Sequence, residues 1–201
     1  MRIQAINNSI NFQKTLKANC RVLDENRKPC ECKIYEIDPC KDRNYFEKLL
    51  SKKSWQNAEY LSFMDHEMQY QHETPNSHIY VLENKKSHCL GYAIATDGNK
   101  HYSIDLLEIA PRYKNDTEGV KGKYKYAGET LVAFLTKKAI EKQKKVIDVD
   151  AAHTATGFYK QACGFDFYDP DYDEMYLDES NYQNLIQKNE KHTKGIINII
   201  S

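Results

Sequence analysis

One stretch of the sequence combines positive charge, small residues and a predicted helix start in a way that suits phosphate binding. Lys123 and Lys125 lie just before Ala127 and Gly128, where apolar residues begin to recur at helical spacing. The first amide groups of a helix have no partner within the helix, and the helix dipole is positive there. Small residues let a phosphate approach those amides closely. The pattern predicts an anion site, and a solvated basic loop capped by glycine is the alternative.

A second feature, a strand whose apolar face changes sides, could present backbone groups to a ligand. In the segment 103–111, Ile104 and Leu106 share one face, and then Leu107 and Ile109 take over the alternation. Such a one-residue change is typical of a β-bulge, which bends a strand and lets it part from its neighbour. We therefore predict a bulge between Leu106 and Leu107. The alternative is a buried strand with these two leucines on opposite faces.

The elements that must position these features follow from periodicity and turn residues. We interpret residues 1–19 as a loosely held arm and residues 112–125 as a loop. The predicted strands are 20–24, 32–37, 77–82, 89–96, 101–110, 146–150, 164–168 and 174–177, and the predicted helices are 41–53, 57–70, 128–142, 156–162 and a short one in the tail. This order predicts an α+β fold with a mixed, mostly antiparallel central sheet flanked by helices.

Two motifs in this order resemble those of the GNAT acetyltransferase superfamily. The segment 107–114, followed by 123–128, is similar to the family's motif A, in which a splayed strand precedes a basic loop and a helix start. The segment 147–165 resembles motif B, a strand followed by a helix that contains Phe158–Tyr159 and then by Gly164–Phe165. The motifs occur in the family's order and at the family's distance from each other.

The chain departs from the family pattern at three places. Tyr126 stands where the first glycine of the loop is usual, and Lys123 stands where Arg or Gln is usual. The connection from Tyr113 to Lys123 is longer than in compact members. One residue more than usual separates Tyr159 from Gly164, which predicts a looser end of that helix.

The resemblance implies a GNAT-like fold with a splayed, bulged strand and a site for acetyl-CoA as co-substrate, without a metal. The backbone of the splayed strand would bind the pantetheine arm, and the loop amides would bind the diphosphate. The implied cofactor-binding residues are Leu107, Ile109, Lys123, Tyr124, Lys125, Tyr126, Ala127, Gly128 and Glu129.

Two catalytic residues are expected, Tyr159 from the resemblance and Glu108 from the predicted bulge. Tyr159 would hydrogen-bond the departing CoA thiolate and give it a proton, because a phenol has a pKa of about 10. Packing in the core is the alternative for this tyrosine. The predicted bulge turns Asp105 and Glu108 away from the four apolar residues of their strand, and Glu108 would take the proton of the attacking amine. Asp105, His101 and His153 are further candidates for that base, and a solvated strand carboxylate is the alternative.

Composition narrows the classes of partner. The 29 Lys and Arg residues balance the 29 Asp and Glu residues, so charge gives no support to a nucleic-acid partner. No apolar run of about 18 residues is present and the N-terminus lacks a signal-peptide pattern, so we expect a cytoplasmic protein without a membrane partner. Six cysteines are expected to be free thiols, although four of them, between residues 20 and 40, leave zinc open as an alternative.

The sequence thus predicts an N-terminal arm and short hairpin over 1–30, a GNAT acetyltransferase domain over 31–178 and a C-terminal tail over 179–201. The expected function is transfer of an acetyl group from acetyl-CoA to a primary amine by direct attack. The acceptor would be a small-molecule or peptide amine, and a homodimer is compatible with this function. The alternatives are a catalytically weak or inactive CoA-binding regulatory or interaction module of the same fold, and a structural protein with an unrelated α+β fold.

Overall fold

The structure, a computed structural model, describes residues 14–38, 42, 76–110, 123–169 and 171–200. Its strands are β1 (Thr15–Asp24), β2 (Pro29–Ile37), β3 (Ser77–Asn84), β4 (Cys89–Asp97), β5 (His101–Ile109), β6 (Tyr124–Lys125), β7 (Val146–Asp150), β8 (Asp166–Asp169), β9 (Tyr172–Asp178) and β10 (Asn198–Ile199). Its helices are α3 (Ala127–Glu141), the 3₁₀ turn η3 (His153–Ala155), the π-helix η4 (Phe158–Cys163) and α4 (Glu179–Thr193). The predicted helices 41–53 and 57–70 lie outside the described residues.

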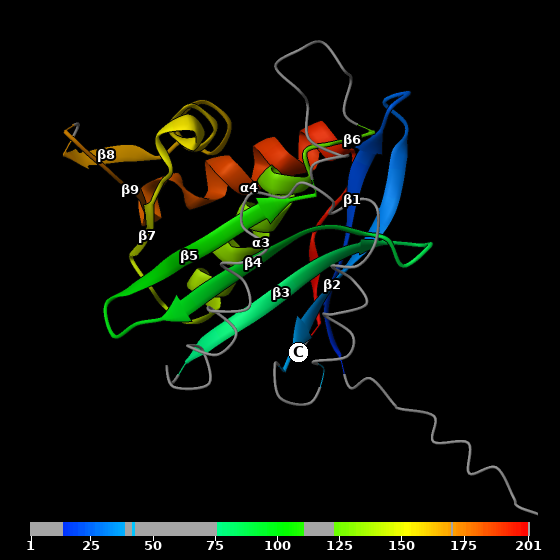
Figure 1. The fold of residues 1–201 in the computed structure, drawn as a ribbon, viewed down its shortest axis with the longest axis horizontal. Coiled ribbons are helices and arrows are strands. Elements are labelled where there is room, and N and C mark those ends of the chain that lie inside the picture. Colours follow the sequence, from blue (N-terminus) through cyan, green and yellow to red (C-terminus); the bar gives the residue numbers. More distant parts are fainter. Residues whose placement is uncertain (1–13, 39–41, 43–75, 111–122, 170, 201) are drawn as a thin grey trace, which may run out of the picture.

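The strands form one mixed, mostly antiparallel sheet, as predicted. Its order is β10-β1-β2-β3-β4-β5-β7-β9-β8, and β6 pairs beside β1 (Figure 1). The pair β5–β7 is parallel, because α3 connects the two strands, whereas the other described pairs are antiparallel. The sheet therefore changes direction next to the strand that the sequence predicts to be bulged.

The N-terminal hairpin is longer than predicted. Asp24 holds its turn, since its carboxylate accepts hydrogen bonds from the amides of Asn26 (2.9 Å) and Lys28 (2.8 Å). The interpretation of residues 15–19 as part of an arm is wrong, because they pair with β2 and β10. The loop predicted up to residue 125 is also wrong at its end, where β6 pairs with β1.

Helix α3 lies between the sheet and α4 (Figure 1). Its apolar side chains pack on the sheet, where the rings of Phe134 and Tyr80 meet edge to face at 4.9 Å. The helix predicted in the tail is α4, which has 15 residues and is not short. Asp178 begins it by accepting a hydrogen bond from the Ser180 amide, as a helix N-cap does. Its buried stripe is Tyr182, Leu185, Ile186, Asn189 and Thr193.

Strand β5 carries the bulge, but at Asp105. Ile104 pairs with Ala95 and Leu106 pairs with Ile94, so Asp105 is the additional residue. The predicted position between Leu106 and Leu107 is therefore wrong, and these leucines lie on opposite faces of the sheet. The polar residue takes the additional position of the bulge because its carboxylate can accept a hydrogen bond from the Thr96 hydroxyl (2.7 Å).

Three further features concern a membrane span, the state of the cysteines and a metal site. No helix in the described part of the chain is long and apolar enough to span a membrane. The described cysteines are free thiols, and Cys40 lies outside the described residues. Within the described ranges, no group of three His, Cys, Asp or Glu side chains is placed to hold a metal ion.

Gly91 marks the closest approach of β4 and β5 beneath α3. A Cβ atom at this position would lie 2.5 Å from the Ile109 Cδ1 atom and 2.8 Å from the Glu108 carbonyl oxygen. We predict that Gly91→Ala lowers the free energy of unfolding by about 1–3 kcal/mol, measured by urea denaturation, because the backbone must shift. Gly157→Ala is the control, since Gly157 has a helical backbone and no atom within 4 Å of such a Cβ. Equal stability of the two variants would contradict the prediction.

Candidate active site

The first turn of α3 presents unpartnered amide groups. The first hydrogen bond of the helix joins the Thr130 amide to the Tyr126 carbonyl at 2.8 Å. No side chain caps this end of the helix, and the amides of Ala127, Gly128 and Glu129 have no partner among the described residues. Free amides at the positive end of a helix dipole are suited to an anion. Lys123 lies exposed just before this turn.

Tyr126 adopts a backbone conformation that normally favours glycine. Its φ is 68° and its ψ is 14°, in the left-handed region. A non-glycine residue held there costs about 1–3 kcal/mol, and it persists only where its surroundings fix it. The Tyr126 ring stacks on the His192 ring of α4, with centroids 4.7 Å apart and planes inclined by 23°. The residue at the family's glycine position thus has its side chain against α4.

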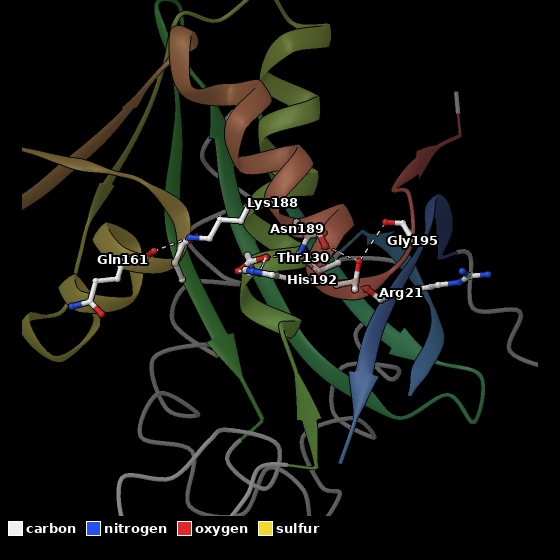
Figure 2. A network of polar contacts seen from close by, with 10 residues as sticks. Arg21, Thr130, Gln161, Lys188, Asn189, His192 and Gly195 are labelled. Atoms are coloured by element: carbon white, nitrogen blue, oxygen red, sulfur yellow. Dashed lines mark hydrogen bonds and ion pairs between the residues drawn. The ribbon is translucent and has the colours of Figure 1, made fainter. Parts of the chain in front are cut away.

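A polar network joins the start of α3 to the end of α4 (Figure 2). Glu129 is only 3% exposed, and its carboxylate accepts hydrogen bonds from His192 Nδ1 (3.0 Å) and Asn189 Nδ2 (3.1 Å). Asn189 also donates to the Thr130 hydroxyl (3.2 Å), which in turn donates to the Arg21 carbonyl (3.4 Å). A carboxylate in the first turn complements the helix dipole, so this network fixes the turn without using its amides.

Strands β5 and β7 part beside this turn. They pair only from His101 to Ile104, whereas β5 continues along β4 as far as Ile109. Beyond Asp105, the β7-side edge of β5 has no strand partner in the described part of the chain. This edge lies close to α3, because a Cβ atom on Gly128 would lie 3.6 Å from Ile109 Cγ1. The gap between β5 and β7 and the free amides of α3 therefore lie next to each other.

The π-helix η4 also lies next to Gly128. It replaces part of the helix predicted over 156–162, and its wider turn accommodates the additional residue between Tyr159 and Gly164. Phe158 faces Gly128, with its Cζ atom 3.1 Å from the position of a Cβ there. Tyr159 is 4% exposed and packs edge to face on Phe165 at 5.3 Å. Burial, and then the nearby Cys163 thiol, raise the pKa of Tyr159 above its ordinary value.

Glu108 lies on the opposite face of the sheet from α3. It is 3% exposed and pairs in register with Tyr92. Burial, and then the Glu108 carboxylate, raise the pKa of Tyr92. The prediction that Glu108 faces away from Leu106 is wrong, because both follow the bulge on the same side of the strand. Leu107 and Ile109 lie on the α3 side.

A groove of about 390 Å³ lies beside the bulge. Four carboxylate residues from three strands line it, together with Tyr168, and none of its lining residues is basic: the acids are Asp105, Asp148, Asp150 and Glu174. Register places Ser103 and Asp148 of this groove on the face of the sheet that also carries Glu108. The face of the sheet opposite α3 is therefore acidic next to the parted strands.

The structure brings most of the predicted cofactor residues together, and three further residues lie next to them. Tyr124 and Lys125 form β6 and pair with β1, while Tyr126 to Glu129 form the helix start. Phe158, Asn189 and His192 were not predicted for this site. The sequence contains a sign of the role of Asn189, because this residue lies in the apolar stripe of α4, where a buried amide needs a hydrogen-bond partner.

The fold and the site define an α+β protein in which a helix start, with first amides unpartnered among the described residues, lies beside parted strands. No family model and no curated protein matches the sequence. Solved structures do match the fold. A putative acetyltransferase from Exiguobacterium sp. 255-15 has a TM-score of 0.55 and 14% identity, covering 76% of this chain and 97% of its own. An acetyltransferase of the GNAT family from Staphylococcus aureus Mu50 has a TM-score of 0.52 and 12% identity, covering 73% of this chain and 98% of its own.

A third solved structure, Ard1 from Thermoplasma volcanium, has a TM-score of 0.52 and 17% identity, covering 73% of this chain and 97% of its own. All three matches extend over nearly the whole of the solved chains. The chain therefore has the fold of the GNAT acetyltransferase superfamily, and the fold predicted from the two motifs is confirmed.

The buried Glu129 carboxylate depends on its amide partner. We predict that Asn189→Ala lowers the free energy of unfolding by about 1–3 kcal/mol, because the carboxylate loses a buried hydrogen bond. Urea denaturation measures this change. Asn198→Ala is the control, since Asn198 is exposed on β10, and its effect should stay within about 0.5 kcal/mol. An unchanged midpoint for Asn189→Ala would show that the network does not stabilise the fold.

Proposed function

We propose that the chain binds acetyl-CoA and transfers its acetyl group to a primary amine. One observation carries this proposal: three unpartnered amides at the start of α3 adjoin the place where β5 and β7 part. The amides of Ala127, Gly128 and Glu129 would bind the diphosphate, and Lys123 and Lys125 would add positive charge. The backbone of Leu107 and Ile109 would bind the pantetheine arm in the gap between the strands.

The same residues suggest how the reaction would proceed. A neutral amine attacks the thioester carbonyl, the new C–N bond forms, and the C–S bond breaks. Backbone N–H groups near Ile109 would polarise the carbonyl oxygen. Tyr159 would donate its proton to the leaving sulfur, and its raised pKa keeps the phenol protonated at neutral pH. Glu108 would take the proton that the amine loses.

The acceptor would approach from the face of the sheet opposite α3. That face carries Glu108 and the acidic groove beside Asp105, and an amine that is protonated in water is attracted to such a surface. A small-molecule or peptide amine is therefore the acceptor class we propose. A CoA-binding module without turnover is the second candidate, because Tyr126 occupies the position of the loop's first glycine. Release of free CoA with a panel of amines distinguishes the two.

Gly128 offers a direct test of the diphosphate site. Acetyl-CoA at a hundredfold excess over its Kd should stabilise the chain by about 2.7 kcal/mol and raise its Tm. We predict that Gly128→Trp abolishes this rise, because the indole would fill the space between Ile109 and Phe158. Lys86→Trp, in the exposed turn before β4, should keep it. Unaltered acetyl-CoA binding by Gly128→Trp would remove the proposed site.

Tyr159 tests the chemical step. We predict that Tyr159→Phe lowers kcat by about 100-fold, since general acid catalysis contributes about 10²–10⁴ in rate, and leaves the Kd for acetyl-CoA unchanged. Steady-state rates with the amine panel and calorimetric binding measure the two effects. Tyr182→Phe is the control, because the buried Tyr182 hydroxyl has no hydrogen-bond partner among the described residues. A Tyr159→Phe variant with full turnover would show that this phenol is not the acid.

A further inference from the structure

We propose that His192 is a positioning residue for the diphosphate-binding loop. Through this residue the C-terminal helix α4 would contribute to acetyl-CoA binding. This inference rests on the proposed function. His192 acts through Tyr126 and Glu129, which lie on either side of the two small residues whose amides face the ligand. One imidazole ring thus holds both ends of the turn.

The first contact fixes the side chain of Tyr126. A glycine would enter the left-handed conformation without strain, whereas tyrosine needs its surroundings to hold it there. The His192 ring supplies a flat surface at 4.7 Å, and the stack keeps the phenol against α4. Without that surface, the ring of Tyr126 would be free to move toward the amides of Ala127 and Gly128, where the diphosphate is expected.

The second contact of His192 holds the Glu129 side chain in place. An ionised carboxylate only accepts hydrogen bonds, so His192 Nδ1 donates to Glu129, at 3.0 and 3.2 Å from its two oxygens. The Glu129 side chain is thereby held in the interior between α3 and α4 and kept off the helix axis where an anion would bind. The negative charge of Glu129 would otherwise oppose a diphosphate at the same helix start.

Helix α4 has independent anchors, so a change at His192 can be tested in a folded chain. Tyr182, Leu185 and Ile186 are buried against the rest of the protein. Lys188 donates from its Nζ atom to the carbonyl oxygens of Gln161 (2.8 Å) and Ala162 (2.7 Å), at the end of η4 (Figure 2). The His192 side chain itself is 32% exposed and fills no large part of the core.

The test uses three substitutions of His192 in the full chain and calorimetric binding of acetyl-CoA. We expect His192→Ala to raise the Kd about tenfold. His192→Phe keeps an aromatic face for Tyr126 and should stay within about threefold of the unsubstituted chain, whereas His192→Gln keeps a donor for Glu129 but lacks that face and should resemble His192→Ala. In turnover assays the KM for acetyl-CoA should rise while kcat is retained, because His192 touches no reacting atom.

A double substitution isolates the contact with Tyr126. Tyr126→Gly restores the residue that needs no support in the left-handed conformation. In that background we expect His192→Ala to change the Kd by less than about twofold, so that the two substitutions are strongly non-additive. If the full tenfold loss persists with Gly at position 126, His192 does not act through Tyr126 and the inference is overturned.

His78→Ala is the matched control. His78 also donates to a carboxylate, at 2.6 Å from Glu36, and also stacks on a tyrosine, Tyr80, but it lies at the start of β3. It should leave the Kd unchanged. If the unsubstituted chain binds acetyl-CoA and His192→Ala binds equally well, this inference alone fails. If the unsubstituted chain does not bind acetyl-CoA, the proposed function fails and the inference fails with it. Should His192→Ala not fold, equal affinity of His192→Phe and His192→Gln would overturn the inference.

Discussion

The structure depends on three amide groups at the start of α3 that are buried and have no partner among the described residues. Unpaired buried donors destabilise a fold, so the amides of this turn need a polar partner. The sheet covers one side of α3 and α4 covers the other, while no side chain caps its first turn. An anion is the partner that both the free amides and the helix dipole favour.

The parting of β5 and β7 follows from the same arrangement. The bulge at Asp105 changes the course of β5 just after its last pair with β7, and η3 and η4 then carry the chain away from the sheet. Gly128 lets α3 lie close to Phe158, whose Cζ atom would be 3.1 Å from a Cβ there, and Ile109 lies at contact distance. The gap between the strands and the free amides are therefore two consequences of one local geometry, and a ligand with both a diphosphate and an extended arm fits it.

Local patterns in the sequence were sufficient for the central elements. Alternation predicted β3, β4 and β5, and helical spacing predicted α3 close to its observed ends. The pattern also predicted that β5 is bulged, but not where, because the deciding contact is between Asp105 and Thr96 on another strand. The strand β6 was missed because it has two residues and pairs with β1, which lies about a hundred residues earlier in the chain. The acidic groove was missed for the same reason, since its residues come from three strands.

Tyr126 shows why the site itself could be predicted only in part. From the sequence, a tyrosine at the family's glycine position argues against an open loop, because a side chain there should crowd the amides. In the folded chain the Tyr126 ring lies on His192 instead, and this contact holds the side chain while the backbone stays left-handed. The compensating residue lies 66 positions later, in a helix outside both motifs, and no local spacing connects the two. The effect of a residue that departs from a family motif can therefore be judged only together with the distant side chain that it contacts.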